Sequence, residues 1–337
     1  MNPFRPGWPI RRWLWWMRCK AGLRARLLKG LAPIFRLKVA QRCLPLLPAM
    51  LLRLPSTWRG ADYNACRQNL ELFGLEPRAC RLLACRYGAI QLQCAIYQRL
   101  YPRHHPERLR AWIRAIAWND PRQHWPRTRV RSTIIVLAHT GEYWMAVACM
   151  IERCPPPKRF IIPIWNFNDP LTRRSLKSLE AFGHRVDILD SNAPKTALAI
   201  ARALKRGDQV IIFADLPVSF GGVRSGEPVD GRLFGRAAQF VKGPMFLAAK
   251  MKCDVLLAGH RAELGGCGEL HVIQWITRAA APQMQAQWAQ AMESFIAEAP
   301  EHWFYLSRLE AFYQRQKTSD EKASGLPGLL QRRGLGG

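Results

Sequence analysis

Short apolar runs alternate with amphipathic segments over residues 132–306, and this alternation constrains the fold more than any other feature of the chain. Residues 132–138 (STIIVLA) and 209–214 (QVIIFA) are aliphatic runs of strand length, which are typical of strands covered on both faces. We predict further strands over residues 159–164, 185–189, 254–259, 271–275 and 303–306. Helices are predicted over residues 62–73, 77–100, 109–117, 141–151, 170–182, 194–205, 240–251 and 284–298. This alternation predicts an α/β fold with a mostly parallel central sheet flanked by helices.

Composition divides the chain into three regions. Residues 1–60 are basic and rich in tryptophan, residues 61–315 carry the alternating pattern, and residues 316–337 are polar and glycine-rich. With 49% hydrophobic residues, the 337-residue chain has enough apolar side chains to build a core, so disorder throughout is excluded. We predict an N-terminal amphipathic segment, one α/β domain and a flexible C-terminal tail.

The chain is strongly basic, because 51 Lys and Arg residues outnumber 24 Asp and Glu residues and give a net charge of +27. Such a charge favours an anionic partner: a membrane surface, an acidic protein or a nucleic acid. The first 61 residues contain no Asp or Glu, and their basic residues are interleaved with Trp8, Trp13, Trp15 and Trp16. Basic residues opposite tryptophan and leucine are typical of a helix that lies in the interface of an anionic membrane.

Two alternatives to membrane contact stay open for this N-terminal segment: an ordinary amphipathic helix packed on the domain, and nucleic-acid binding. No nucleic-acid-binding motif supports the second alternative, so nucleic acid is not an expected partner. The best apolar run, residues 43–52, contains Pro45 and Pro48 and is shorter than the roughly 20 residues that a membrane span requires. We therefore predict a peripheral membrane protein.

Several catalytic classes lack their sequence signatures. The ten cysteines form no C-x-x-C pair, which argues against a zinc ribbon or a thioredoxin-like site and fits reduced thiols in the cytosol. The chain also lacks G-x-S-x-G, G-x-x-x-x-G-K-S/T and H-E-x-x-H. We expect no metal and neither a serine-hydrolase elbow nor a nucleotide-binding P-loop.

One histidine stands where a parallel sheet places functional groups. Residues 132–138 lead directly into His139, and open α/β sheets bind ligands beyond the carboxyl ends of their strands. Glu142 follows three residues later, and a carboxylate beside a histidine fixes its tautomer and stabilises the imidazolium. We predict that His139 and Glu142 form a general-base pair. Two alternatives stay open: His139 as a structural residue, and Glu142 as a first-turn charge at the positive end of a helix.

Six short blocks between residues 62 and 312 follow the order and spacing of one known family. They are residues 65–73 (ACRQNLELF), 139–144 (HTGEYW), 163–171 (PIWNFNDPL), 212–215 (IFAD), 232–235 (RLFG) and 299–306 (APEHWFYL). The chain thereby resembles the late acyltransferases of bacterial lipid A biosynthesis, within the lysophospholipid acyltransferase superfamily. The family places its carboxylate five residues after the histidine, where this chain has Trp144, so Glu142 substitutes for it on geometric grounds.

The resemblance implies roles for further residues. Asn168 and Asp169 belong to a block that is expected to contact substrate. Asp215 ends a central strand and either positions the acceptor or stabilises helix–sheet packing. Arg232 and Arg236, together with Lys242, either provide positive charge for a phosphate or an anionic tetrahedral intermediate, or form a solvated basic face. Phe234, Phe240, Met245 and Phe246 either line a groove for an acyl chain or belong to the core.

The reaction that the resemblance implies is acyl transfer. A fatty acyl chain would move from the thioester of an acidic acyl carrier protein or of acyl-CoA to a hydroxyl or amine, without a cofactor. The acceptor would be lipid-like: a lipid A precursor of lipopolysaccharide, an ornithine lipid or a polyene pigment. The location implied is the cytoplasmic face of the bacterial inner membrane, where a basic surface suits both the carrier protein and anionic lipid. The alternative is a catalytically degenerate member that binds lipid or acyl carrier without turnover.

Overall fold

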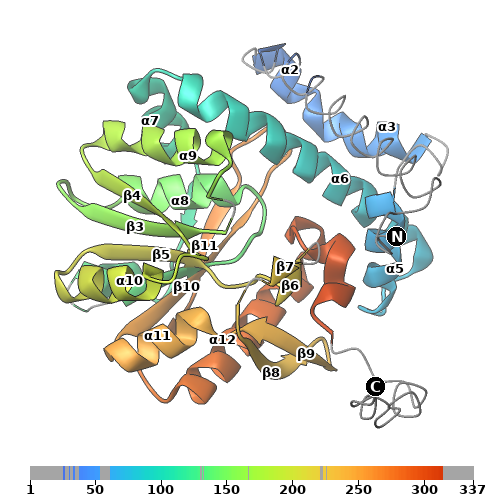
Figure 1. Cartoon of the computed structure of the whole chain (residues 1–337). Helices are drawn as coiled ribbons and strands as arrows, with labels where there is room; N and C mark the ends of the chain where they lie inside the picture. The colour runs from blue at the N-terminus through green and yellow to red at the C-terminus, as the bar shows by residue number, and fades with distance from the viewer. Residues whose placement is uncertain are drawn as a thin grey trace, which may run out of the picture.

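A seven-stranded sheet with helices on both faces forms the centre of the fold (Figure 1). The structure is a computed structural model that describes residues 26, 30, 33, 34, 38–53, 61–129, 131, 133–165, 167–220, 223–224 and 226–313. In spatial order the strands are β1 (Ala117–Asn119), β11 (Glu269–Ile276), β10 (Asp254–Arg261), β2 (Thr133–Leu137), β5 (Gln209–Phe213), β3 (Arg159–Ile164) and β4 (Arg185–Asp190). All neighbours are parallel except β10 and β11. The predicted α/β class with a mostly parallel sheet is confirmed.

The two central strands have apolar side chains on both faces. Every residue of β2 and β5 is buried. Along β2, Ile134 and Val136 join one apolar cluster, whereas Ile135 and Leu137 join a second cluster on the opposite face. Because successive side chains of a strand point to opposite faces, an unbroken aliphatic run suits a strand between two layers of helices.

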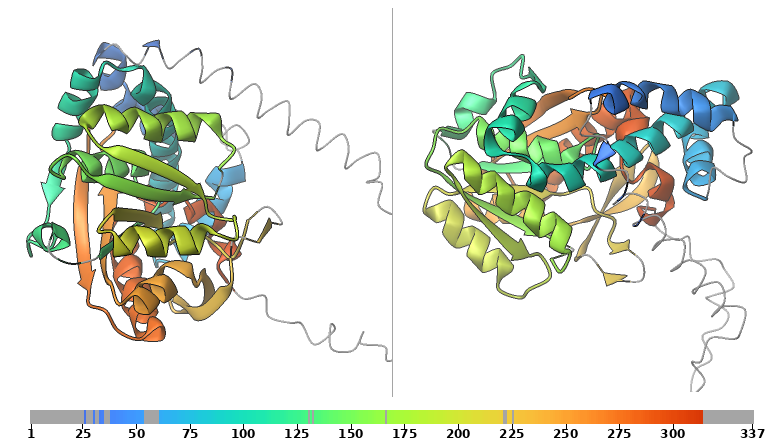
Figure 2. Two further views of the ribbon diagram at one scale, coloured as in Figure 1. Left: turned by 60° about the vertical axis from the view of Figure 1, so that its left-hand side comes forward. Right: turned by 90° about the horizontal axis from the view of Figure 1, so that it is seen from above.

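The helices form these two layers, which Figure 2 shows on either side of the sheet. One face is covered by α7 (Pro106–Arg114), α8 (Tyr143–Glu152) and α9 (Pro170–Lys177), which continues as the 3-10 helix η5 (Ser178–Phe182). The other face is covered by α10 (Thr196–Lys205), α11 (Gly243–Met251) and α12 (Ala281–Glu298). The helix–sheet–helix sandwich follows from the strand pattern.

The N-terminal helices lie across the end of this sandwich. After α5 (Ala61–Glu71), the long helix α6 (Pro77–Leu100) contributes its first half to one apolar cluster and its second half to the other. The shorter helices α2 (Lys38–Arg42), η2 (Leu44–Leu46) and α3 (Leu47–Arg53) precede them in the chain, and α3 lies along α6 (Figure 1). Short 3-10 helices complete the described elements: η3 (Tyr101–Arg103), η4 (Trp125–Arg129), η6 (Pro300–His302) and η7 (Leu306–Ala311).

Three parts of the domain differ from the predicted elements, and the first is the edge strand β1, which was not predicted. A β-hairpin of β8 (Pro228–Leu233) and β9 (Arg236–Val241), preceded by the short strands β6 (Ser219–Phe220) and β7 (Val223–Arg224), was not predicted. The helix predicted over residues 240–251 begins only at Gly243, because Phe240 and Val241 belong to β9. The strand predicted over residues 303–306 is wrong: Trp303 forms an isolated bridge with Thr140, and the chain then enters η7.

The predicted flexible tail at residues 316–337 lies outside the described residues, and so does most of the predicted interfacial segment at residues 1–60. Among the residues that the structure does describe, no helix combines the length and the apolar character needed to cross a membrane.

Candidate active site

The site is built at the point where the two central strands end. β2 and β5 are parallel neighbours whose last residues, Leu137 and Phe213, are paired across the ladder. His139 lies two residues beyond Leu137, and Asp215 lies two residues beyond Phe213. Equal offsets from a paired position bring the two side chains together at the carboxyl edge of the sheet, where α/β folds bind their ligands.

Asp215 holds His139 through both its backbone and its ring. The Asp215 side chain is fully buried, and its Oδ1 lies 2.6 Å from Nδ1 of His139. Its Oδ2 accepts a hydrogen bond from the backbone N–H of His139 at 2.7 Å and one from the indole N–H of Trp303 at 3.0 Å. A carboxylate only accepts hydrogen bonds, so this geometry places the imidazole proton on Nδ1 and leaves the lone pair on Nε2.

The Nε2 side of His139 faces a cavity of about 320 Å³ that is lined mainly by apolar and aromatic side chains. The His139 ring stacks on Phe213 with 4.3 Å between ring centroids. The rings of Tyr143 and Tyr305 meet it edge-on at 5.0 and 5.3 Å. No described residue forms a hydrogen bond with Nε2, and the His139 side chain is 14% exposed. The nitrogen is therefore open to a molecule in the cavity.

The segment after α12 completes the site. The backbone N–H of Phe304 donates to the carbonyl oxygen of His139 at 2.8 Å, and the N–H of Gly141 donates to that of His302, also at 2.8 Å. This pairing brings the indole of Trp303 to Asp215 and the rings of Phe304 and Tyr305 to the cavity. Residues far apart in the chain thus surround His139.

Gly141 lets the chain turn between the histidine and α8. Its φ is +52°, in the left-handed region that favours glycine. A Cβ at this position would lie 2.7 Å from the backbone nitrogen of Ala262 and would also collide with the carbonyl oxygen of His260. The turn has no room for a side chain, so the orientation of His139 depends on this glycine.

Glu142 does not pair with His139, contrary to the prediction. Its Oε1 accepts a hydrogen bond from Nε2 of Gln93 at 2.5 Å, and its Oε2 accepts one from the hydroxyl of Tyr101 at 2.9 Å. The reason is the sharp turn at Gly141, after which residue 142 points towards α6 and η3. The orienting role that we assigned to Glu142 belongs to Asp215 in this geometry.

Glu142 also fails to act as a charge at the helix N-terminus. It is the N-cap residue of α8, but its side chain accepts no capping hydrogen bond from that helix. Burial raises the pKa of its carboxyl group from 4.5 to about 8, although the hydrogen bonds from Gln93 and Tyr101 oppose this shift. The group is therefore mostly neutral at pH 7 and forms part of a buried polar network.

Two buried histidines support the same network as neutral groups. Nδ1 of His260 accepts a hydrogen bond from the backbone N–H of Glu142 at 3.0 Å, and its Nε2 lies 3.0 Å from the carbonyl oxygen of Cys267. Nδ1 of His302 accepts from the backbone N–H of Ala262 at 3.1 Å. Burial lowers the pKa of His260 to about 4 and that of His302 to about 3. Neither ring is charged at neutral pH, so both serve as supports.

Asn168 and Asp169 were both predicted to bind substrate. Asp169 lines the cavity, but both its oxygens cap α9 by accepting from the backbone N–H groups of Leu171 and Thr172. Asn168 is exposed and lies outside the lining of the cavity. Of the two residues expected to contact substrate, only Asp169 lines the cavity, and its carboxylate caps α9.

The arginines predicted to bind an anion lie away from the cavity. Arg232 donates to the carbonyl oxygen of Gly235 at 2.5 Å, within the turn of the β8–β9 hairpin. Arg236 pairs with Glu310 at 3.2 Å and covers the ring of Tyr313. Both side chains are exposed, as in the alternative of a solvated basic face.

The residues predicted to line an acyl groove lie elsewhere in the fold. Phe240 and Met245 are buried in the core on the α10–α12 face, whereas 45% of Phe246 is exposed. Neither these residues nor Phe234 lines the cavity at His139. The alternative that Phe240 and Met245 belong to the core agrees with the structure.

Sequence reasoning missed the aromatic wall and the third partner of Asp215. Trp303, Phe304 and Tyr305 lie in the 299–306 block, which carries the resemblance but was assigned no role. Among the described residues no cluster of histidine, cysteine and acidic side chains suits a metal ion. No protein-family model matches the sequence, and no curated protein shows significant similarity to it.

Proposed function

We propose that this chain is a membrane-associated acyltransferase in which His139 is the general base and Asp215 positions it. The observation that carries the proposal is the hydrogen-bonded pair at the carboxyl edge of a parallel sheet, with the free ring nitrogen facing an apolar cavity. A positioned histidine can take a proton from a bound hydroxyl or amine, and a paired carboxylate stabilises the imidazolium that forms. The order of the sequence blocks supports the acyltransferase class.

In the proposed reaction, Nε2 of His139 accepts the proton of the acceptor group while the acceptor oxygen or nitrogen attacks the thioester carbonyl. The tetrahedral intermediate then collapses, the C–S bond breaks, and the imidazolium returns the proton to the departing thiolate. The products are an ester or amide and a free thiol, and no acyl group is attached to the enzyme. This sequence of steps restores neutral His139 for the next turnover.

We further propose that two tyrosines of the cavity wall stabilise the developing oxyanion. Tyr143 and Tyr305 both line the cavity. Burial raises the pKa of both phenols above their ordinary value of 10, so both keep their protons at neutral pH. Neutral O–H groups in a partly buried site are suited to stabilise negative charge on a tetrahedral intermediate. We assign this role to the two tyrosines.

A second cavity provides room for an apolar chain. It has a volume of about 370 Å³ and lies between α3, α5, α6 and the segment that follows Phe304. Leu47 and Leu51 of α3 line it, and Phe304 lines both this cavity and the one at His139. We assign the acyl chain to these two adjoining spaces, with the Phe304 ring between them.

The outer surface of the N-terminal helices suits a lipid interface. Ile34, Leu46 and Met50 are 51%, 60% and 61% exposed. Arg42 and Arg53, at the ends of α2 and α3, are exposed as well. Apolar side chains flanked by arginines bind the interface of anionic membranes. We therefore place these helices at a membrane surface, next to the cavity that α3 lines.

The decisive experiment measures acyl transfer by the full-length protein in anionic lipid vesicles. Medium- and long-chain acyl thioesters of CoA and of an acyl carrier protein are supplied, thiol release is followed, and the lipids are analysed by mass spectrometry. His139→Gln and Asp215→Asn should each lower the rate by about 10² or more. His105→Gln, at an exposed histidine outside the site, is the matched control and should keep the wild-type rate.

Wild-type transfer that survives His139→Gln, in a variant whose circular dichroism and melting curve match the wild type, would exclude His139 as the base. Wild-type protein that binds the thioesters without releasing thiol would instead favour the catalytically degenerate binding protein. The mass added to the lipid identifies acceptor and chain together.

A further inference from the structure

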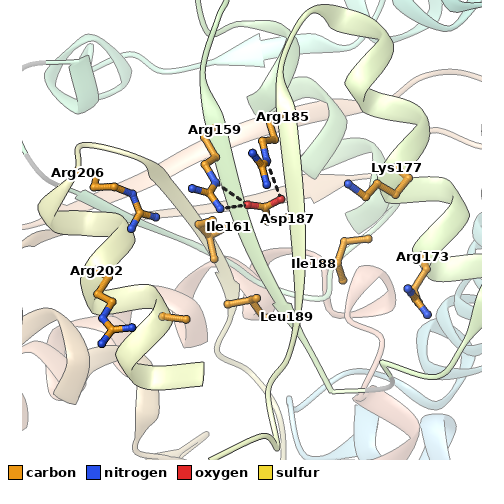
Figure 3. Close-up of a pocket in the computed structure, with 11 residues that line it drawn as sticks. Arg159, Ile161, Arg173, Lys177, Arg185, Asp187, Ile188, Leu189, Arg202 and Arg206 are labelled. Atoms are coloured by element: carbon orange, nitrogen blue, oxygen red, sulfur yellow. Dashed lines mark hydrogen bonds and ion pairs between the residues drawn. The ribbon is translucent and has the colours of Figure 1, made fainter. Parts of the chain in front are cut away.

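Another cavity lies away from His139, at the free edge of the sheet. It has a volume of about 500 Å³ and crosses the last strand, β4, between side chains of α9 and α10 (Figure 3). Six cationic side chains line it: Arg159, Arg173, Lys177, Arg185, Arg202 and Arg206. Figure 3 shows them arranged around a floor that includes Ile161 and Leu189. None of them belongs to the proposed catalytic machinery.

Only part of this positive charge is neutralised. Asp187 in the middle of the cavity accepts from Nε of Arg159 at 2.5 Å and from Nε of Arg185 at 3.1 Å. Outside the lining, Glu180 pairs with Lys177 and Asp208 with Arg206. Six cations against three carboxylates leave a surplus of three positive charges around one concavity.

Two of the arginines have guanidinium N–H donors that are not used in hydrogen bonds. Within the described part of the chain, the guanidinium of Arg202 has neither a hydrogen-bond nor an ion-pair partner. Arg173 rests on the ring of Phe167 with its guanidinium 4.7 Å from the centroid, a contact that leaves its N–H groups uncommitted. A guanidinium carries five N–H donors in a rigid fork that matches phosphate oxygens. The two forks lie on opposite sides of the floor (Figure 3).

Protection of an edge strand accounts for only some of these charges. Charged side chains on an edge strand prevent pairing with another chain, and Arg185 and Asp187 on β4 serve that purpose. The cations of α9 and α10 are not on the strand, yet they border the same cavity from both sides. Like charges gathered in this way repel one another, and a bound anion removes that repulsion.

We propose that this cavity binds a ligand carrying two or more phosphate groups, with its apolar or sugar portion on the floor of Ile161, Leu189 and Ala199. Several phosphates match a surplus of three charges, and arginine forks bind them in bidentate fashion. Nucleic acid is the poorer fit, because the described lining includes no aromatic side chain on which a base can stack. The phosphates belong either to a soluble phosphate ester or to a lipid headgroup.

The position of the cavity links it to the proposed reaction. α9 contributes Thr172 to the His139 cavity and Arg173 to the cavity lined by the six cations. Likewise, Asp187 of β4 lines the cationic cavity, and Ser191, just after β4, lines the His139 cavity. Four residues of strand span about 13 Å. A substrate held by its phosphates at Arg173 and Arg202 can therefore extend to His139. This linkage, unlike the binding itself, rests on the proposed function.

Calorimetric titration of the full-length protein with pyrophosphate, at constant ionic strength, tests the binding. We expect one-to-one binding that Arg173→Gln/Arg202→Gln weakens about tenfold or more, because two charge-assisted contacts are lost. The matched control, Arg174→Gln/Lys205→Gln, removes two exposed cations from the same helices but outside the lining and should bind as the wild type does. Equal losses in both double variants, or no binding by the wild type at millimolar pyrophosphate, would overturn the proposal.

Further experiments distinguish a soluble phosphate ester from a lipid headgroup and from an acidic protein as the ligand. Vesicles with cardiolipin, which has two phosphates, are compared with phosphatidylglycerol vesicles of equal charge. Competition by pyrophosphate for cardiolipin binding supports a lipid headgroup, and binding of soluble pyrophosphate alone supports a phosphate ester. Binding of polyglutamate without pyrophosphate binding would overturn the proposal in favour of an acidic protein. His139→Gln should bind pyrophosphate normally, so a failure of the catalytic proposal is distinguishable from a failure of this site.

Discussion

Glu142 offers a direct test of the buried network beside the active site. Both its carboxyl oxygens accept hydrogen bonds, from Gln93 and Tyr101, and the hydrogen-bond partner of the His139 ring is Asp215. Glu142→Gln keeps the shape of the side chain and one acceptor oxygen, replaces the other oxygen with a donor, and removes the ionisation. The substitution therefore separates the cost of charging a buried group from any role in catalysis.

The size of the effect follows from proton linkage. Burial raises the pKa of Glu142 to about 8, from 4.5. Between these two values the folded state holds a proton that the unfolded state has released, so this contribution to stability is complete below pH 4.5 and is lost as the pH rises to about 8. Since each pKa unit is worth about 1.4 kcal/mol, the wild type should lose about 3 kcal/mol relative to Glu142→Gln between about pH 5 and about pH 8.

The assay is urea unfolding of the wild type and Glu142→Gln at both pH values, at the same ionic strength. Glu107→Gln is the control, because Glu107 forms only an exposed pair with Arg110 and its removal should change stability by less than about 1 kcal/mol at either pH. If the free energy of unfolding changes equally with pH in the wild type and in Glu142→Gln, the argument is refuted. A fall in acyl transfer of about 10² in correctly folded Glu142→Gln would return Glu142 to the role that its spacing suggested.

Two further substitutions test the turn and the membrane surface. Gly141→Ala should lower the free energy of unfolding by about 2 kcal/mol or more, because it adds a backbone collision to the strain of a left-handed residue; Gly74→Ala, with φ of +70° and open space around the new Cβ, should show the strain alone in the same denaturation assay. Leu46→Glu/Met50→Glu should reduce sedimentation with anionic vesicles by about tenfold or more, since two exposed apolar side chains are replaced by charges that anionic lipid repels. Equal losses for the two alanine variants, or unchanged sedimentation, would contradict these expectations.

The secondary structure was largely predictable where local pattern decides it. The predicted bounds of β3 and α6 agree with the structure, and β2, β5 and α12 shift by only a few residues. The hairpin of β8 and β9 was missed because its strands are largely exposed or half-buried and neither is a continuous apolar run. The strand predicted over residues 303–306 failed because aromatic content favours strands locally, whereas these side chains are held around Asp215 and His139.

The pairing of His139 with Asp215 depended on information that no local pattern contains. Both residues come directly after a predicted buried strand, and this was visible in the sequence. Which strands are neighbours was not visible: β2 and β5 are adjacent although β3 and β4 lie between them in the chain. Glu142 was the nearest carboxylate in the sequence, but the left-handed turn at Gly141 directs it elsewhere.

By itself, then, the sequence determined the α/β class, the two buried central strands and the delivery of His139 to their carboxyl edge, because hydrophobic periodicity and strand length are local properties. The tertiary structure alone decided the rest. Strand order selected Asp215 as the partner of His139, and the segment after α12 brought Trp303 to that carboxylate. The helices α9 and α10 and the strands β3 and β4 gathered six cations around one cavity. These contacts join residues that are distant in the chain, and their free energy depends on the packing of the whole domain.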